Sequence, residues 1–154
     1  MRNAERGEAT RLDGRELRIA VVQARFNAEL TDRIADVCIR ELISLGVAVA
    51  DVLHVRVPGA LEIGPALNAL ADADEHDALV AVGCVLRGET YHFELVANES
   101  GAAVTRVSID HGIAIANAIL TCDTHAQAEE RADDKGRDAA RVAVEMANLL
   151  DELS

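Results

Sequence analysis

The feature that most constrains the fold of this chain is a repeated alternation of short apolar runs with longer amphipathic segments. Between the apolar runs, hydrophobic residues recur at helical spacing, in segments that we expect to end near residues 45, 73 and 109. The apolar runs have the length and composition of buried strands: Leu17–Ala24, Val47–Val57, Asp77–Leu86 and Ile113–Leu120. Alternation of this kind predicts one α/β domain with a parallel sheet and helices on both faces.

The two ends of the chain depart from this alternation. After the fourth strand, Thr124 and Gln127 match a capping box and predict a short helix to about Ala132. Asp133-Asp134-Lys135-Gly136 then predicts a polar turn before a last helix that reaches Leu153. Residues 1–15 are polar and weakly periodic, so we expect a flexible arm, or a strand added to a neighbour's sheet, ahead of a domain at residues 16–154.

Composition narrows the class of protein further. Aromatic residues make up 2% of the chain, so the core must consist of alanine, valine, leucine and isoleucine. A net charge of −12 disfavours nucleic acid and anionic membranes as partners, and no apolar run is long enough to span a bilayer. Cys38, Cys84 and Cys122 show no metal-ligand spacing, and the N-terminus lacks the apolar core of a signal peptide. These features predict a cytoplasmic protein.

The position of a ligand site follows from the expected sheet. In open α/β sheets, ligands bind beyond the carboxyl ends of the strands, where the strand order reverses. A flavodoxin-like order of 2-1-3-4 places that reversal between the first and third strands. Phe26 then offers a flat face to a ring, Glu62 accepts hydrogen bonds, and His92 moves protons. The alternative is a set of ordinary loops in which Phe26 is a core aromatic residue.

The segment from Gly83 to His92 joins the third strand to the following helix. We expect Gly88 to let the backbone turn sharply, and Thr90 to accept a hydrogen bond from a free N–H group of the first helical turn. Free N–H groups and the helix dipole make such a start an anion site. His92 would lie beside the bound anion as an acid or base. The alternative is a plain loop with an exposed histidine.

Several motifs, in this order and spacing, resemble those of the lumazine synthase family. The resemblance covers nearly the whole chain from about Leu17. It is carried by Ala24-Arg25-Phe26-Asn27, Val57-Pro58-Gly59-Ala60-Leu61-Glu62-Ile63, Gly83 to His92 with Asn98-Glu99, Leu120-Thr121, Gln127-Ala128-Glu129-Glu130-Arg131-Ala132, and Lys135-Gly136 with Glu145-Met146-Ala147.

The resemblance implies a specific activity and assembly. Family members condense 5-amino-6-(D-ribitylamino)uracil with 3,4-dihydroxy-2-butanone 4-phosphate, without a metal or organic cofactor. The products are 6,7-dimethyl-8-ribityllumazine, phosphate and water, in the penultimate step of riboflavin biosynthesis. The implied fold is a flavodoxin-like three-layer α/β/α sandwich. The implied assembly is a homopentamer whose active sites lie between subunits, and some members build pentamers into an icosahedral shell.

The resemblance also assigns roles to residues that bind the pyrimidine. Phe26 stacks on the ring, with Asn27 beside it, and Asn117 approaches from across the subunit interface. The other implied contacts come from the ends of the second and third strands. Ala60, Leu61 and Glu62 line the ring and ribityl chain, and Cys84, Val85 and Leu86 contact the pyrimidine.

The phosphate site and the proton carrier are assigned in the same way. Backbone N–H groups at Glu89 and Thr90 hold the phosphate, and Arg131 of the adjacent subunit completes the site. Lys135 adds positive charge. His92 carries protons during amine addition and loss of water and phosphate, because an imidazole exchanges protons readily near neutral pH.

Two departures from the family pattern leave alternatives open. Many members have an aromatic residue where Leu61 and Asn117 stand, which is compatible with a non-catalytic flavin- or lumazine-binding or shell-forming paralogue. The turn at residues 133–136 is short compared with that of typical shell-forming members and favours a free pentamer. A flavodoxin-like regulatory module is a weaker alternative, since the first strand is not followed by a cluster of acidic residues.

Overall fold

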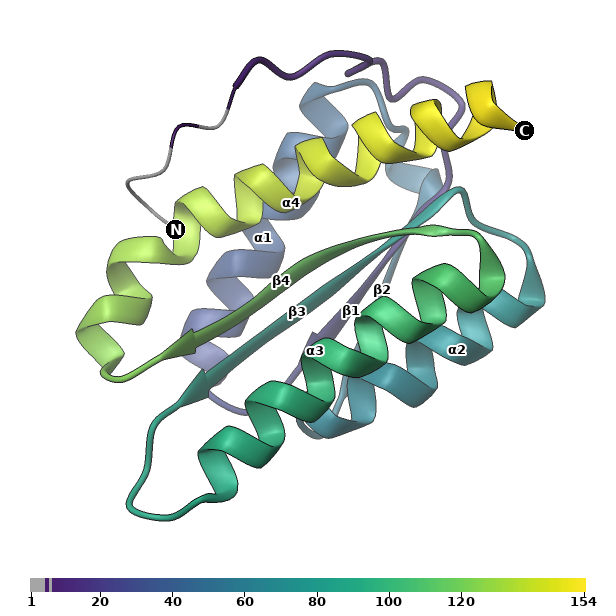
Figure 1. The fold of residues 1–154 in the computed structure, drawn as a ribbon. Coiled ribbons are helices and arrows are strands. Elements are labelled where there is room, and N and C mark those ends of the chain that lie inside the picture. The colour runs from purple at the N-terminus through teal and green to yellow at the C-terminus, as the bar shows by residue number, and fades with distance from the viewer. Residues whose placement is uncertain (1–4, 6) are drawn as a thin grey trace.

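The computed structural model describes residue 5 and residues 7–154, and in this part of the chain a single parallel sheet forms the middle layer. The sheet has four strands in the order β2-β1-β3-β4, as the sequence predicted (Figure 1). Neighbouring strands pair in parallel throughout, with Ile19 of β1 opposite both Val52 of β2 and Ala78 of β3. The strands are β1 (Ile19–Ala24), β2 (Val52–Val57), β3 (Ala78–Leu86) and β4 (Ala114–Cys122).

Helices cover both faces of the sheet, which confirms the predicted three-layer sandwich (Figure 1). Because successive strand side chains point to opposite faces, Val21 packs towards α1 and α4 while Ala20 packs towards α2 and α3. No helix among the described residues is long and apolar enough to cross a bilayer. The helices are α1 (Ala28–Ser44), α2 (Ile63–Ala73), α3 (His92–His111) and α4 (His125–Leu153).

The second strand is shorter than the sequence predicted. It begins at Val52 rather than Val47, and a 3-10 turn, η1 (Val49–Asp51), precedes it. The reason lies in its partner: β1 begins at Ile19, which is opposite Val52, so no strand lies beside the earlier residues. Val47 is nevertheless buried in the core, which explains why its segment has the composition of a strand.

The C-terminal region is one helix of 29 residues, and the predicted polar turn at residues 133–136 is wrong. Gly136 is buried within α4, where an added Cβ would lie 2.5 Å from the carbonyl oxygen of Ile34 in α1. Asp133 forms an ion pair with Arg33 of α1, the Nε–Oδ1 distance being 2.7 Å. The polar and glycine residues that suggested a turn therefore mark a close helix–helix contact. The preference for a free pentamer, which rested on that turn, loses its basis.

The segment just before β1 lies against the ends of α1 and α4 (Figure 1). Gly14 is buried, and its N–H donates to the carbonyl of Leu45 at 2.8 Å. The side-chain amide of Asn148 donates to the carbonyls of Arg11 and Asp13 at 2.8 and 2.9 Å. Within the predicted arm, residues 1–4 and 6 lie outside the described residues. The division into an arm at 1–15 and a domain at 16–154 stays a prediction.

Candidate active site

The carboxyl ends of β1 and β3 border a cleft of about 250 Å³, closed on one side by the segment after β2. This is the edge of the sheet where the strand order reverses and where the sequence placed a ligand site. The predicted residues that line the cleft are Phe26, Asn27, Ala60, Leu61, Glu62, Cys84, Val85, Leu86 and His92. Segments at residues 26–27, 60–62 and 84–92, which lie far apart in the sequence, thus meet at one site.

Phe26 supplies a free aromatic face to this cleft. Its side chain is 72% exposed, which rules out the alternative in which it is a core residue. The ring lies close over Gly59, where an added Cβ would be 3.3 Å from Phe26 Cδ2. Glycine at position 59 therefore allows the ring to lie against the backbone, and the ring can stack on a flat ligand.

Asn27 fixes the position of the loop that carries Phe26. Its backbone is left-handed, with φ of 56°, a conformation that asparagine tolerates better than most residues. Its side-chain amide donates to the carbonyl of Cys84 at 2.8 Å and so ties the end of β1 to the end of β3. One N–H of the amide is therefore used within the chain, and the carbonyl oxygen and the second N–H of Asn27 can meet a ligand.

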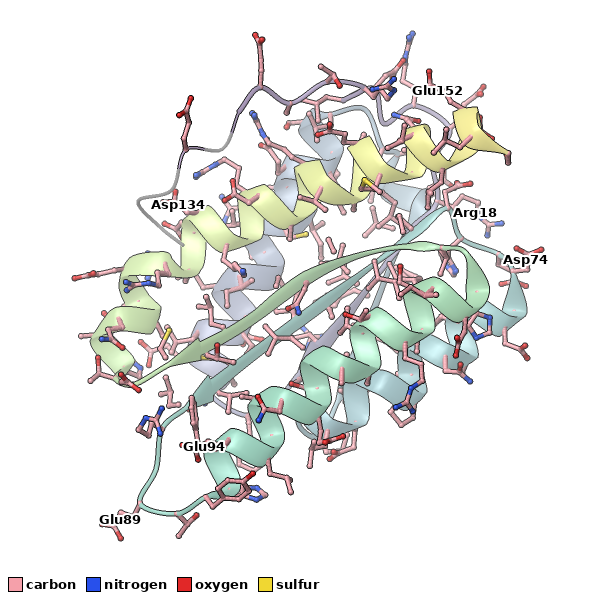
Figure 2. All side chains as sticks on the ribbon, viewed as in Figure 1. Arg18, Asp74, Glu89, Glu94, Asp134 and Glu152 are labelled. Carbon is pink, nitrogen blue, oxygen red and sulfur yellow. The ribbon has the colours of Figure 1, made fainter. Side chains whose placement is uncertain are left out.

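The turn from β3 to α3 is open and exposed. Thr90 Oγ accepts a hydrogen bond from the N–H of His92, as predicted, but at a long 3.4 Å. Gly88 is not in a left-handed conformation, and a Cβ added there would meet no described atom within 4 Å, so the explanation of Gly88 by a sharp turn is wrong. Figure 2 shows Glu89 at the tip of this turn, pointing away from the body of the molecule.

The first turns of α3 separate the cleft from a second hollow. His92 and Val96 line the cleft, whereas Phe93 and Ala97 line the hollow between α3, the end of β4 and the start of α4. This division follows from the helical period, because residues four apart share a face. Arg131 lies in the second hollow, where its Nη1 donates to the carbonyl of Gln127 at 2.9 Å. Within one chain, Arg131 and His92 thus line different hollows.

The remaining predicted residues also lie outside the cleft. Asn117 is exposed on β4, and its Oδ1 accepts a hydrogen bond from the N–H of Ile119 at 2.9 Å. Lys135 is half-buried on α4 near Cys122, whose thiol pKa is raised by burial in spite of the opposing charges of Arg131 and Lys135. Glu89 and Thr90 adjoin the cleft without lining it. The roles of these residues stay predictions.

The electrostatics of the cleft leave its cysteine inert. Burial raises the pKa of Cys84 to about 11, and burial also raises the pKa of Cys122. Both thiols are therefore protonated at neutral pH and are poor nucleophiles. Apart from this cysteine, the polar side chains that line the cleft in the described chain are those of Asn27, Glu62 and His92.

Sequence reasoning missed a few residues of the cleft wall. Ala24, Gly59 and Val96 also line the cleft. Val96 could have been found from its spacing, since it follows His92 by four positions on a helix that the sequence predicted. Gly59 received no role of its own from the sequence, because its contact with the Phe26 ring depends on two segments that meet in space.

Comparison with known proteins agrees with this geometry. The family model described as 6,7-dimethyl-8-ribityllumazine synthase matches residues 16–151. The 6,7-dimethyl-8-ribityllumazine synthases of Leptothrix cholodnii and Paracidovorax citrulli are 66% and 64% identical to this chain, over 100% of each chain. That of Polaromonas sp. is 60% identical over the same span. The chain belongs to the 6,7-dimethyl-8-ribityllumazine synthase family.

Proposed function

We propose that the cleft between β1 and β3 is the pyrimidine half of a lumazine synthase active site and that His92 is its proton carrier. The enzyme condenses 5-amino-6-(D-ribitylamino)uracil with 3,4-dihydroxy-2-butanone 4-phosphate to 6,7-dimethyl-8-ribityllumazine, phosphate and water. The observation that carries the assignment is the meeting of Phe26, Glu62 and His92 in one cleft, next to the N-terminus of α3. A stacking surface, a hydrogen-bond acceptor and a proton carrier are what this condensation requires.

The pyrimidine is bound by a flat ring and by polar atoms at the strand ends. The exposed face of Phe26 stacks on the ring, with the Asn27 carbonyl oxygen beside it. Glu62 accepts hydrogen bonds from ring N–H or ribityl hydroxyl groups. The rest of the wall contacts the ring and the ribityl chain through Ala60, Leu61, Cys84, Val85 and Leu86.

The phosphate is bound at the start of α3. Free N–H groups there, together with the helix dipole, favour an anion, and the weak Thr90 bond leaves those groups accessible. Glu89 contributes its backbone N–H, since its carboxylate points away from the body of the chain (Figure 2). Arg131 of an adjacent subunit adds a bidentate contact, and Lys135 adds charge. These local donors oppose the net charge of −12.

His92 serves the proton transfers of the condensation. The amine of the pyrimidine adds to the ketone of the butanone phosphate, and a proton must leave that nitrogen while another reaches the departing hydroxyl. An imidazole next to both substrates accepts the first proton and donates the second. Holding the two substrates together supplies much of the remaining rate, because it makes the bimolecular step effectively unimolecular.

A ring pentamer with sites between subunits accounts for the residues that lie outside the cleft. Arg131 and Asn117 do not reach the cleft of their own chain, and a second copy brings such residues to it. The volume of about 250 Å³ is also below the roughly 300–1,000 Å³ typical of small-molecule sites, although two substrates must fit. We place the enzyme in the cytoplasm, because its free cysteines suit a reducing compartment.

Lumazine fluorescence tests the proposal directly. Purified wild-type protein should form product well above the spontaneous rate, and His92→Ala should lower kcat by about 100-fold with little change in either KM. Tight flavin binding by wild-type protein without turnover would instead favour the non-catalytic alternative. Equal kcat in wild type and His92→Ala would remove the role of His92.

Arg131→Ala tests the phosphate half of the site. Loss of a charged, hydrogen-bonded contact should raise the KM for the butanone phosphate about tenfold or more, while the KM for the pyrimidine stays within twofold. Arg137→Ala is the matched control, since Arg137 lies on the same helix and forms a local ion pair with Asp134 at 3.1 Å. Equal values for the two variants would remove Arg131 from the site.

A further inference from the structure

We infer that Arg87 is a positioning residue that holds the start of α3, and with it the phosphate-binding turn, in the geometry that the reaction needs. The inference rests on the proposed function, because it concerns the same anion site. Arg87 itself is the first residue after β3, and the turn it would control consists of Gly88, Glu89 and Thr90.

Arg87 is joined to three segments at once. Its N–H donates to the carbonyl of Cys122 at 3.0 Å, which anchors the residue to the end of β4. Its Nε donates to Asp123 Oδ1 at 2.7 Å, just before α4 begins. Its Nη1 donates to Glu94 Oε1 in the first turn of α3. The guanidinium group therefore bridges the end of β3, the end of β4 and the start of α3.

The same group also lies over an aromatic ring of α3. The guanidinium carbon of Arg87 is 4.5 Å from the centroid of the Phe93 ring, within the range of a cation–π contact. Phe93 and Glu94 both follow His92 directly, so two adjacent residues of the first helical turn are held by one planar side chain. A contact of this kind fixes both the distance and the rotation of the helix start.

The turn itself has little else to hold it. A Cβ added at Gly88 would meet no described atom within 4 Å, and Thr90 contributes one long hydrogen bond of 3.4 Å. Glu89, Thr90 and His92 are exposed. The position of the turn is therefore set by its two ends, and Arg87 connects those ends by its backbone on one side and its guanidinium group on the other.

Arg87 acts through the turn rather than as a phosphate ligand. Its Nε and Nη1 donors already meet two carboxylates, Asp123 and Glu94, which neutralise its charge locally. The hydrogen bonds to these carboxylates raise the pKa of Arg87, and the hydrogen bond to Arg87 lowers the pKa of Glu94. An anion at the start of α3 would thus be met by backbone N–H groups that Arg87 has placed.

Arg87→Gln is the test, with kinetics for both substrates and titration with inorganic phosphate. We expect the KM for the butanone phosphate and the Kd of inorganic phosphate to rise about tenfold, since several modest contacts are lost together. The KM for the pyrimidine should stay within about twofold. Arg87→Lys keeps the charge but loses the planar fork, and Glu94→Gln removes one ion pair, so each should give a rise of about threefold.

Arg33→Gln is the matched control. Arg33 forms a similar forked pair with Asp133, at 2.7 and 3.0 Å, and its side chain is 46% exposed against 48% for Arg87. This pair joins α1 to α4, away from the anion turn. Both KM values and the phosphate Kd should be unchanged in Arg33→Gln.

The outcomes separate this inference from the proposed function. If Arg131→Ala raises the KM for the butanone phosphate and Arg87→Gln does not, Arg87 has no positioning role and the phosphate site stands. If Arg87→Gln and Glu94→Gln raise both KM values equally, the cluster is structural only. If the wild type neither binds inorganic phosphate nor turns over, the proposed function fails first. Should Arg87→Gln fail to fold, Arg87→Lys and Glu94→Gln serve as the test: the KM for the butanone phosphate should rise while the KM for the pyrimidine stays constant.

Discussion

The helices α3 and α4 begin and pack in opposite ways. At the start of α4, Thr124 Oγ accepts from the N–H of Gln127 and the Gln127 side chain accepts from the N–H of Thr124, both at 3.2 Å. At the start of α3, the N-cap is Tyr91, and within the described chain its side chain caps no N–H group. The capping box thus gives the Gln127 N–H of α4 a partner within the chain, while the start of α3 has only the long Thr90 contact and leaves its N–H groups available to a ligand.

The glycines inside these helices repeat the contrast. Gly136 of α4 faces α1 so closely that a Cβ would lie 2.5 Å from the carbonyl oxygen of Ile34, whereas a Cβ at Gly101 of α3 would meet no described atom within 4 Å. Leu95 and Ile109 of α3 are 41% and 75% exposed. The comparison teaches that α4 is capped at its start and packs tightly on α1 at Gly136, whereas the start of α3 and the surroundings of Gly101 are open within the described chain.

Gly136→Ala carries the largest expected effect on stability. The added methyl group overlaps the α1 backbone, which cannot move as a flexible side chain could. We expect the free energy of unfolding to fall by about 2 kcal/mol, after allowing for the gain of about 1 kcal/mol in helix propensity. Urea unfolding followed by circular dichroism measures this change in the free energy of unfolding. An unchanged midpoint would mean that α1 and α4 are less tightly packed than the glycine indicates.

Thr124→Ala tests the difference between the two helix starts. Loss of the cap should destabilise the protein by about 1 kcal/mol, because an N–H group at the start of α4 loses its partner. The KM for the butanone phosphate should not change, since the backbone donors of the proposed anion site belong to α3 and Arg131 lies seven residues beyond the cap. A rise in that KM as large as the one expected for Arg87→Gln would show that the two helix starts are coupled.

Gly101→Ala has a smaller expected effect of opposite sign. With open space around Gly101 in the described chain, alanine should raise the free energy of unfolding by up to about 1 kcal/mol through helix propensity. Light scattering coupled to size exclusion should give the same assembly mass as the wild type. A smaller mass, or a lower melting temperature, would show that another subunit packs directly against Gly101.

The sequence predicted those features of the fold and the site that depend on neighbouring residues or on a general rule, and missed those that depend on contacts between distant segments. The alternation of strands and helices follows from periodicity, and with a flavodoxin-like strand order the meeting of Phe26, Glu62 and His92 follows from the rule for parallel sheets. The continuity of α4 through Gly136 does not, because the reason for that glycine lies on α1. The same holds for Asn27, whose amide partner is the carbonyl of Cys84 on another strand.

The part of the proposed site that a second subunit would supply follows neither from sequence periodicity nor from the structure of one chain. Arg131, Asn117 and Lys135 acquired their roles from family resemblance, and none of them lines the cleft of its own chain. Arg87 was visible in the sequence as a basic residue at a strand end. Its carboxylate partners, Glu94 and Asp123, come from two different elements, so the cluster appears only once the fold is known.

The smallest expected effect is a change of stability with pH, caused by protonation of His54 on the α1 side of the sheet. His54 Nε2 contacts Gln23 Oε1 at 2.8 Å, and the Gln23 amide donates to Asp32 Oδ1 at 2.6 Å, so a polar chain runs from β2 to α1. Burial lowers the pKa of His54 in the folded state. Its contribution to stability is therefore fully present above the unfolded pKa of about 6.5 and is lost as the pH falls below that value towards the folded pKa.

The wild type should lose stability between neutral and mildly acidic pH, and His54→Gln should lose less. We expect the difference to be smaller than the roughly 1 kcal/mol of an ordinary hydrogen bond. Burial also lowers the pKa of His76, so the variant His54→Gln retains part of the pH dependence until His76 is replaced as well. Melting temperatures of wild type, His54→Gln and the double variant His54→Gln/His76→Gln across this range measure the effect. If the curves run parallel, water reaches His54 freely, and the α1 side of the sheet is less closed than the α4 contacts indicate. Such a result would reduce the difference between the α1–α4 face and the α2–α3 face of the sheet, because solvent would then reach polar side chains on both faces.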